Sequence, residues 1–328
     1  MQDVAEAAGV HRTTVSLALR DSPKLPAATR ARVQAVAKRL GYRPDPLVSA
    51  LMTARVSRRH PVHQGTLAFL SNDAKRPPDW ARFPKSYGRL FRGAAERATE
   101  RGYDLAPFWL REPGLTGAMF SRQLSDRGIH GLLIAPHSGS DNRIDLDWSR
   151  FAVVELGYNL VEPQVNRVVH DYFGAMKRVW HEVLARGHQR IGFLLPENAV
   201  TKTRHLLRAA FIDAQQLLPP DALLPILSPP RLTQDVIDPW LEREQPDAVI
   251  IGGIQYPGSP PSFRIPRRIP VFNLDCVRRG GGDVGIFQDW PAMGAIGVDL
   301  LIAQMGRGEY GLPAQPYSVQ VTGHWQAG

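Results

Sequence analysis

The stretch that decides the fold lies near the start of the chain, where residues 3–16 read DVAEAAGVHRTTVS. Its small residue Ala5 and its glycine turn at Gly9 allow two short helices to cross closely, and Val15 supplies the apolar side chain between them. The second helix then projects its first side chains outward, which is the geometry that enters a DNA major groove. The stretch therefore predicts a helix-turn-helix.

Three helices are predicted in the first 41 residues, over residues 2–8, 11–19 and 26–40. In the third helix Val33, Val36 and Leu40 recur at helical spacing, and Gly41 suits its end. Asp45 can cap a further short helix over residues 46–54. The basic, polar stretch 55–64 that follows is expected to be a linker.

Several side chains near the start of the second helix suit contacts with DNA. Arginine can bond guanine in two places, threonine can bond a base or touch a thymine methyl, and leucine makes apolar contacts, so the predicted base contacts are Arg12, Thr13 and Leu17. The predicted phosphate contacts are the nearby polar and basic residues Thr14, Ser16, Arg20, Lys24 and Thr29.

The distribution of charge agrees with a polyanionic partner. Residues 1–60 hold eleven lysines and arginines but only four acidic residues, so they carry seven of the nine excess positive charges of the 328-residue chain. A basic headpiece on a nearly neutral body fits nucleic acid. A solvated basic face would give the same count, so charge alone does not decide.

From residue 65 onward, short apolar strands alternate with helices, which predicts parallel sheets covered on both faces. The expected strands cover residues 66–71, 103–109, 131–135, 152–156, 167–169, 190–195, 248–251 and 271–274. The expected helices cover residues 86–101, 117–126, 173–186, 202–216 and 291–304. The Pro-, Gly- and Ser-rich stretch 255–268 is expected to be a loop.

Other features limit the function classes. No apolar run reaches the roughly 18 residues of a membrane span, and MQDVAEAAGV lacks the features of a secretory signal. A single cysteine, Cys276, cannot form an internal disulfide. No spacing typical of a metal site, phosphate loop or nucleophile with its base is found, so no metal, no cofactor and no catalytic residue is predicted.

The motifs together make the chain similar to the lactose-repressor (LacI/GalR) family. They are D-V-A-x-x-A-G-V-x-x-x-T-V-S at 3–16, T-R-x-R-V at 29–33, L-G-Y-R-P at 40–44, D-x-x-G at 171–174 and G-H-x-x-I at 187–191. The resemblance implies a homodimer on a pseudo-palindromic operator. It also implies a minor-groove hinge helix, whose assigned contacts are Val48, Ser49, Leu51 and Met52, with Leu51 as the wedge.

The fold class implied is an all-α helix-turn-helix headpiece (1–45), a hinge helix and linker (46–64), and an α/β two-lobed core with parallel sheets (65–328). That core resembles periplasmic-binding proteins, with the chain crossing between lobes near residues 158–165 and 275–290 and a small effector in the cleft. The family's frequent sugar-gripping arginine aligns with Leu207, and the nearest arginine is Arg208. Asp275 retains an effector-site acid.

The effector candidates follow from the ends of predicted strands and from the resemblance. They are Asp275, Arg208, His137, Glu155, Tyr256 and Trp290. Alternatives stay open for four of them. Asp275 can instead cap a loop, and His137 can belong to a plain surface loop. Glu155 can be salt-bridged rather than at the cleft, since a buried carboxylate needs a partner, and Trp290 can be core.

The predicted function is a cytoplasmic, nucleoid-associated transcriptional regulator. It is expected to be a repressor that binds double-stranded operator DNA as a homodimer, responds to a small molecule such as a carbohydrate, and has no membrane partner. A solute-binding protein without a DNA function is the alternative, which the basic first 60 residues disfavour. An enzyme is a third class, which the lack of a catalytic constellation disfavours.

Overall fold

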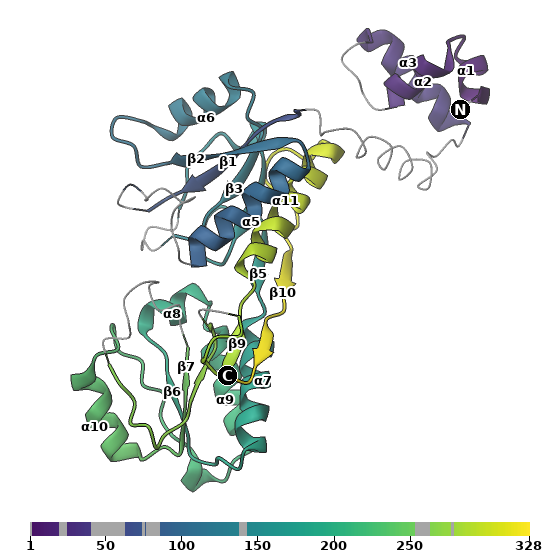
Figure 1. The fold of residues 1–328 in the computed structure, drawn as a ribbon. Coiled ribbons are helices and arrows are strands. Elements are labelled where there is room, and N and C mark those ends of the chain that lie inside the picture. The colour runs from purple at the N-terminus through teal and green to yellow at the C-terminus, as the bar shows by residue number, and fades with distance from the viewer. Residues whose placement is uncertain are drawn as a thin grey trace. The chain divides into compact units, whose positions relative to one another are not determined.

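The structure is a computed structural model that describes residues 2–19, 25–40, 63–73, 76, 86–137, 143–252, 263–276 and 279–328. It divides into two compact units, Met1–Val62 and His63–Gly328. Figure 1 shows the first unit as a group of short helices and the second as strands with flanking helices. We call them the headpiece and the core and describe each by itself.

The headpiece consists, in its described part, of α1 (Gln2–Ala7), α2 (Arg12–Leu19) and α3 (Ala27–Arg39). Gly9 lies between α1 and α2 with φ of +61°, a conformation that glycine adopts at no steric cost. Among the described residues, Val10, Leu19 and Leu25 pack partly buried against a core of small and β-branched side chains: Val4, Ala5, Ala8, Val15, Ala18, Val33, Val36 and Ala37. The predicted helix-turn-helix is therefore confirmed, with helix ends within one residue of the expected ones.

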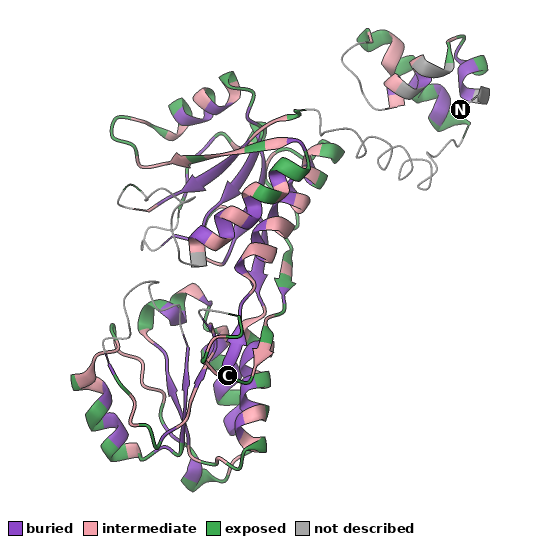
Figure 2. Cartoon of the chain, in the orientation of Figure 1, coloured by how far each residue is buried: buried purple, intermediate pink, exposed green. Residues whose placement is uncertain are grey.

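The first lobe of the core is built on a parallel sheet with strand order β10-β5-β4-β3-β1-β2 in the described residues. The strands are β1 (Gly65–Ser71), β2 (Tyr103–Trp109), β3 (Gly131–Ile134), β4 (Ala152–Leu156), β5 (Asn166–His170) and β10 (Ser318–Val321). Strands β1, β3, β4 and β5 are buried almost throughout, as Figure 2 shows. Runs of this kind belong to a sheet covered on both faces.

Helices cover the two faces of this sheet. One face packs against α5 (Ser86–Glu100) and α11 (Trp290–Arg307), and the other against α6 (Gly117–Asp126). Two glycines let α5 and α11 touch along their backbones. A Cβ at Gly93 would overlap the carbonyl of Pro291, and one at Gly294 would overlap the carbonyl of Leu90.

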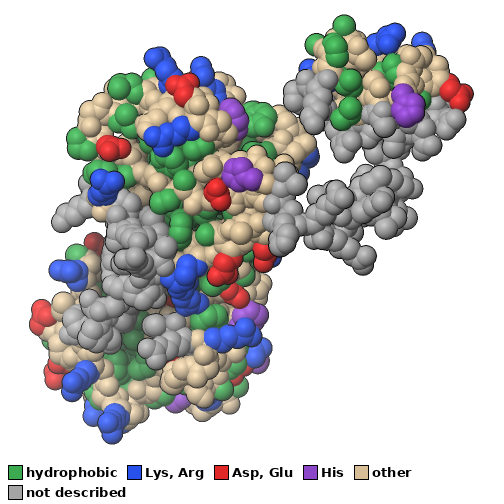
Figure 3. Space-filling view, turned by 45° about the horizontal axis from the view of Figure 1, so that its top comes forward, with side chains coloured by type: hydrophobic (Ala, Val, Ile, Leu, Met, Phe, Trp, Pro, Cys, Tyr) green, Lys and Arg blue, Asp and Glu red, His purple; other side chains and the backbone are tan. Residues whose placement is uncertain are grey.

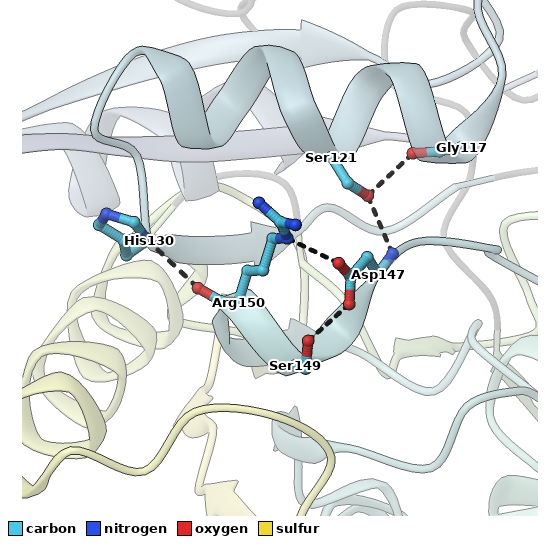
Figure 4. Close-up of polar contacts among 6 residues, drawn as sticks. All are labelled: Gly117, Ser121, His130, Asp147, Ser149 and Arg150. Atoms are coloured by element: carbon cyan, nitrogen blue, oxygen red, sulfur yellow. Dashed lines mark hydrogen bonds and ion pairs between the residues drawn. The ribbon is translucent and has the colours of Figure 1, made fainter.

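Hydrogen bonds join α6 to the short polar segment 147–150, which precedes β4 (Figure 4). The Ser121 hydroxyl donates to the Gly117 carbonyl at 2.8 Å and accepts from the Asp147 amide at 2.9 Å. Asp147 in turn accepts from Ser149 and Arg150, and these bonds hold the pKa of its carboxyl below the ordinary value. The 3₁₀ turn η1 (Trp148–Arg150) is thereby fixed against α6.

The second lobe is built on a sheet with strand order β11-β9-β8-β7-β6 in the described residues, parallel except for the β11–β9 pair. The strands are β6 (Ile191–Leu194), β7 (Ala248–Ile251), β8 (Val271–Asn273), β9 (Gly285–Phe287) and β11 (His324–Gln326). The helices are α7 (Tyr172–Ala185), α8 (Glu197–Lys202), α9 (Leu206–Gln215) and α10 (Gln234–Glu244). Helices α7 and α9 pack on one face of the sheet and α10 on the other.

The chain passes between the lobes at three places in the described residues. It leaves the first lobe between β5 and α7, returns between β9 and α11, and leaves again between β10 and β11. The sequence had suggested two crossings, near 158–165 and 275–290. The first lies later because β5 pairs with β4 and so belongs to the first sheet, and the third was missed because β10 and β11 are short.

The remaining elements agree with the predictions to different degrees. The eight expected strands are all present within one residue at each end. The helix expected over residues 202–216 is instead α8 and α9, and helix α10 was not predicted because Pro239 stands inside it. Residues 263–268 form no helix, and the hinge stretch 46–54 lies outside the described residues.

Candidate functional site

The headpiece positions one helix for contact with DNA. Helix α2 begins at Arg12, and its first turn is closed by the amides of Thr14 and Val15, which donate to the His11 carbonyl. On the other side of α2, Gln34 of α3 donates to the Ala18 carbonyl at 2.9 Å. Because Val15 and Ala18 are fully buried against α1 and α3, the orientation of α2 within the headpiece is fixed.

The predicted DNA contacts fall on and around this helix. Leu17 and Thr14 lie on α2 and are half-buried, and Thr29 is half-buried in the first turn of α3. The side chains of Arg12, Thr13 and Ser16 lie outside the described part of the structure, although their backbone is helical. Six further predicted contacts lie wholly outside the described residues, namely Arg20, Lys24, Val48, Ser49, Leu51 and Met52.

The charged surface of the core differs from that of the headpiece. On the face drawn in Figure 3, lysine and arginine side chains of the core are dispersed, with aspartates and glutamates among them. This agrees with a net charge of the chain that is concentrated in its first 60 residues.

The second candidate site is a pocket in the core. Its walls come from the end of β5, the start of α7, the α8–α9 region, the end of β8 and the start of α11. The lining residues are His170, Tyr172, Asn198, Ala199, Lys202, Thr203, Leu207, Leu274, Asp275, Gln288 and Trp290. The carboxyl ends of parallel strands are where open α/β sheets bind ligands.

One part of the pocket is polar and centred on Asp275. The indole nitrogen of Trp290 donates to Asp275 Oδ1 at 3.2 Å. Burial raises the pKa of Asp275 to about 7, and the Trp290 hydrogen bond and the charge of Arg89 oppose this shift. The carboxyl group is thus poised to gain or lose a proton near neutral pH.

His170 lies against the same tryptophan. Its ring meets that of Trp290 edge to face, with centroids 4.5 Å apart, and only 1% of the residue is exposed. Burial lowers its pKa to about 3, so the imidazole is neutral at physiological pH. Neither ring nitrogen has a hydrogen-bond partner among the described residues. A buried polar group in that condition costs about 1–3 kcal/mol.

Gln288 repeats this pattern. It is 2% exposed, and its amide nitrogen donates to the Leu274 carbonyl at 3.0 Å. Its Oε1 has no hydrogen-bond partner in the part of the chain that the structure describes. This oxygen lies beside Gly323, between β10 and β11. The unsatisfied nitrogens of His170 are therefore the clearer sign of a bound ligand or water in the pocket.

The facing part of the pocket is apolar. Ala199, Leu207 and Leu274 are at most 5% exposed. The hydroxyl of Thr203, which lies beside them, already donates to the Ala199 carbonyl at 2.8 Å. The α8–α9 region thus contributes apolar Ala199 and Leu207 together with polar side chains such as Lys202, and Leu274 adds an apolar residue at the strand ends.

Arg204 connects the α8–α9 side to the first lobe. Its guanidinium donates to the Leu160 carbonyl at 3.1 Å and lies 5.2 Å from the centre of the Tyr158 ring. Arg204 and His205 both have positive φ, +47° and +62°. Non-glycine residues adopt this region at a cost of about 1–2 kcal/mol each. This backbone strain lies between two residues of the pocket wall, Thr203 and Leu207.

The other side of Leu160 is held by Glu155. The Glu155 carboxylate accepts from the Leu160 amide at 2.7 Å and pairs with Arg167 at 3.5 Å, and both charged side chains are buried. Burial raises the pKa of Glu155, while Arg167 acts in the opposite direction. Of the two alternatives for Glu155, the structure has the salt bridge. The residue does not line the pocket in the described residues.

The effector candidates from the sequence therefore lie in different places. Asp275 and Trp290 line the pocket. Arg208 is exposed on α9, because the helix turns Leu207 inward at the preceding position. His137 is buried beyond β3, where its carbonyl accepts from Asn159 at 2.7 Å, and Tyr256 lies outside the described residues.

Sequence reasoning missed much of the pocket. His170 directly follows an expected strand, which was the signal that could have found it. Gln288 and Tyr172 adjoin the crossings between lobes, whose places the strand pattern did not fix. Leu207 was noted only as the position of a missing arginine.

Other chemistry finds no support in the described residues. No group of three or more His, Cys, Asp or Glu there is arranged to hold a metal ion. Burial raises the pKa of the Cys276 thiol to about 12, so it is not a nucleophile at neutral pH. Among the described helices, none is long and apolar enough to cross a membrane.

Comparison with known proteins supports the helix-turn-helix headpiece and the fold of the core. Residues 1–45 match the family model described as bacterial regulatory proteins, lacI family. An HTH-type transcriptional regulator of Mycolicibacterium smegmatis is 27% identical over 213 residues, 64% of this chain and 55% of that protein. The maltose regulon regulatory protein MalI of Escherichia coli K12 is 27% identical over 199 residues, 59% of this chain and 53% of MalI. The alignments thus span about half the length of these relatives.

Solved structures share the fold along the whole chain. The transcriptional regulator CelR in complex with cellobiose has a TM-score of 0.55 and 21% identity, covering 99% of this chain and 98% of that one. The Lac repressor bound to ONPG has a TM-score of 0.53 and 17% identity, with coverages of 98% and 96%. At these identities the likeness shows the fold.

The fold and the two sites define a class of protein, a helix-turn-helix headpiece on a two-lobed core of the periplasmic-binding-protein type. Residues 1–45 match the lacI family of bacterial regulatory proteins, and the whole chain shares the fold of solved repressors of that type. Both curated relatives are named as regulators, in agreement with the prediction that the chain is not an enzyme.

Proposed function

We propose that this chain is a transcriptional repressor that binds a pseudo-palindromic operator as a homodimer and is controlled by a small carbohydrate. One observation carries the proposal. A single chain joins a helix-turn-helix, matched to a family of bacterial regulators over residues 1–45, to a pocket whose buried polar atoms lack protein partners in the described residues. One unit reads DNA, and the other senses a molecule.

In the headpiece, α2 occupies the major groove. Arg12, Thr13 and Leu17 contact base edges, and the phosphate contacts come from Thr14, Ser16, Arg20, Lys24 and Thr29. The hinge residues Val48, Ser49, Leu51 and Met52 enter the minor groove, where Leu51 wedges between base pairs. This assignment rests on the helix-turn-helix geometry and on the resemblance of residues 3–16 and 40–44 to the family.

In the core, a carbohydrate binds between Asp275, Trp290 and the α8–α9 side. Two solved neighbours of this fold, CelR with cellobiose and the Lac repressor with ONPG, are sugar-type complexes, which supports a carbohydrate as the effector class. In this proposal the headpiece (1–45) and the hinge and linker (46–64) bind DNA, and the core (65–328) binds the effector. The protein works in the cytoplasm, associated with the nucleoid.

The contact between Arg204 and Leu160 couples the pocket to the first lobe. A ligand that presses on Thr203 and Leu207 acts on the strained residues between them. Because Arg204 holds a loop of the first lobe, moving it changes the relation of the lobes. Two lobe arrangements with different ligand affinity are what allostery requires.

The test is enrichment of duplexes from a randomised DNA library by the full chain. We expect recovered sequences to contain two inverted half-sites, since a symmetric dimer reads a palindrome. Recovery of sequences without a common motif would contradict the operator-binding proposal. It would leave a ligand-binding protein without regulatory DNA function as the alternative.

A further inference from the structure

A chain of contacts runs from a buried ion pair of the first lobe to the second lobe. Glu155 of β4 lies directly opposite Arg167 of β5, and neither charged side chain is more than 4% exposed. One Glu155 oxygen faces Arg167 Nε at 3.5 Å, and the other accepts from the Leu160 amide at 2.7 Å. The Leu160 carbonyl accepts from Arg204, which lies between α8 and α9. The ion pair therefore supports the residue on which Arg204 is seated.

Glu155 is an acid that faces two arginines, one from each lobe. Burial raises the pKa of its carboxyl to about 7, and Arg167 and Arg204 both oppose this shift. The charge of Arg204 also disfavours the charge of Arg167. Tyr158 faces the same group, since its ring centre lies 5.6 Å from the guanidinium carbon of Arg167 and 5.2 Å from that of Arg204. Glu155 thus offsets the repulsion between two cations of different lobes.

The position of Glu155 indicates a role beyond holding the sheet together. Its neighbours on β4, Val154 and Leu156, are fully buried apolar residues. Replacing a buried ion pair by apolar side chains is often neutral or stabilising, because desolvation of the two charges offsets their attraction. The sheet therefore gains little from the pair. The bond to the Leu160 amide instead joins the pair to the contact between the lobes.

The charge of Glu155 decides what Arg204 meets at the first lobe. An ionised Glu155 attracts Arg204 and neutralises Arg167, whereas a protonated Glu155 leaves two like charges facing each other. Arg204 favours the ionised form of Glu155. By linkage, loss of the proton must favour the docked Arg204 to the same extent. Raising the pH through 7 therefore strengthens this contact between the lobes, and lowering the pH weakens it.

We propose that Glu155 is a proton-sensitive positioning residue, which controls the contact of Arg204 with the first lobe and makes the response of the regulator depend on pH. The inference deepens the proposed function and rests on it, because Arg204 carries the coupling between the pocket and the first lobe there. Glu155 does not line the pocket in the described residues. It acts through Leu160 and Arg204, which it holds near pH 8 and releases near pH 6.

Energy transfer between two dyes on the full chain measures the lobes without DNA. Cysteines at exposed positions of α6 and α9, Ala118→Cys and Ala209→Cys, carry the dyes. Cys276 is 1% exposed and does not compete for them. Excess unlabelled chain leaves one labelled copy in each dimer. We expect the population with docked Arg204 to rise about threefold to tenfold from pH 6 to pH 8, as one proton gives when its pKa differs by up to about one unit between two arrangements. Equal transfer at both pH values would overturn the proposal.

Variants assign the response to Glu155. Glu155→Gln has the shape of the protonated acid and should behave at both pH values as the parent does at pH 6. Glu162→Gln is the matched control, the same change at an exposed acid paired with Arg143 at 3.4 Å, and should keep the response. The comparison also separates Glu155 from Asp275, whose pKa is about 7 as well. Arg204→Ala, at an exposed position, tests the same contact if Glu155→Gln does not fold. A response that persists in Arg204→Ala, or in folded Glu155→Gln, would overturn the proposal.

Operator affinity separates this inference from the proposed function. At one fixed salt concentration, the ratio of affinities for the enriched DNA sequence at pH 8 and pH 6 should differ about threefold or more between the parent and Glu155→Gln. If energy transfer depends on Glu155 but the chain binds no DNA sequence specifically, the proton-sensitive contact stands and the regulatory function fails. If the chain binds its enriched sequence but neither measurement depends on Glu155, the proton-sensitive contact is wrong and the regulator stands.

Discussion

The headpiece and the core pocket are recognition sites built in opposite ways. The proposed base contacts of the headpiece, Arg12 to Leu17, lie within two turns of a single helix. The pocket draws its residues from five separate stretches between His170 and Trp290. A local motif can therefore reveal the first site, whereas the second exists only once the strands have been placed in order.

The two regions also differ in how much packing supports them. In the described part of the headpiece, the buried core residues are alanines and valines, with Leu19 and Leu25 partly buried against them. A unit of about 60 residues is marginally stable. Each core lobe instead packs both faces of a sheet with aromatic and branched side chains. Changes in the headpiece core are therefore expected to have larger effects than changes of similar size beside the pocket.

The largest expected effect comes from Val15→Ser in the fully buried centre of the headpiece. Lost packing and a buried hydroxyl should destabilise the headpiece by about 2–4 kcal/mol. Specific DNA affinity, measured by fluorescence anisotropy, should then fall by about a hundredfold, since 1.4 kcal/mol is a factor of ten. Ala28→Ser, at an exposed position of α3, is the control. Similar losses of DNA affinity in both variants would contradict the claim that the buried headpiece core is the sensitive region.

A smaller effect is expected from Leu51→Ala in the proposed hinge. Loss of the wedge should weaken specific binding by about tenfold, because insertion between base pairs contributes to the bent complex only. Binding to scrambled DNA, measured at the same salt concentration, should be almost unchanged. Equal losses on both DNAs would refute the wedge.

Arg204→Ala should weaken the coupling between sugar binding and operator binding more than it changes the affinity for either ligand. We expect the effect of sugar on operator affinity to shrink severalfold, because the side chain that joins the α8–α9 side to Leu160 is removed. Sugar affinity itself should change less, since Arg204 does not line the pocket in the described residues. The ratio of operator affinities with and without sugar is the readout. An unchanged ratio would show that coupling takes another route.

The smallest effect concerns stability and pH at Asp275. An unfolded aspartate loses its proton near pH 4, but the folded one keeps it until about pH 7, so the folded protein binds more protons in that interval. Stability contributed by this group is therefore present at pH 4 and is lost as the pH rises to 7. Asp275→Asn should melt about 2–4 °C higher than the parent at pH 8.

At pH 3 the two proteins should melt more nearly alike, because Asp275 is then mostly protonated in both the folded and the unfolded chain. Melting curves followed by circular dichroism at the two pH values give the comparison. A variant that is less stable than the parent at pH 8 would mean that the charged carboxylate stabilises the empty pocket.

The headpiece could largely be predicted from the sequence, whereas the pocket of the core could not. The spacing of Ala5, Gly9 and Val15 gave the helix-turn-helix, and apolar runs gave eight strands of the core. The pairing of β5 with β4 could not be predicted, because strand order depends on contacts that local sequence patterns do not specify. For that reason the pocket residues His170 and Gln288 were missed, while Arg208 was favoured over the inward-facing Leu207.

Glu155 shows the limit of burial arguments in a similar way. The sequence required a partner for a carboxylate inside an apolar strand, and two environments satisfied that requirement. Arg167 decided between them, and it is reached only across the β4–β5 pair. The need for a partner was predictable, whereas the identity of the partner depended on strand register.

The most direct test of the account is fluorescence anisotropy of the full chain on its enriched DNA sequence and on a scrambled version, at one fixed salt concentration. A preference of roughly a thousandfold or more is predicted, as for specific regulators. Equal and salt-sensitive binding to both DNAs would contradict the account, because the headpiece would then bind phosphates without reading bases.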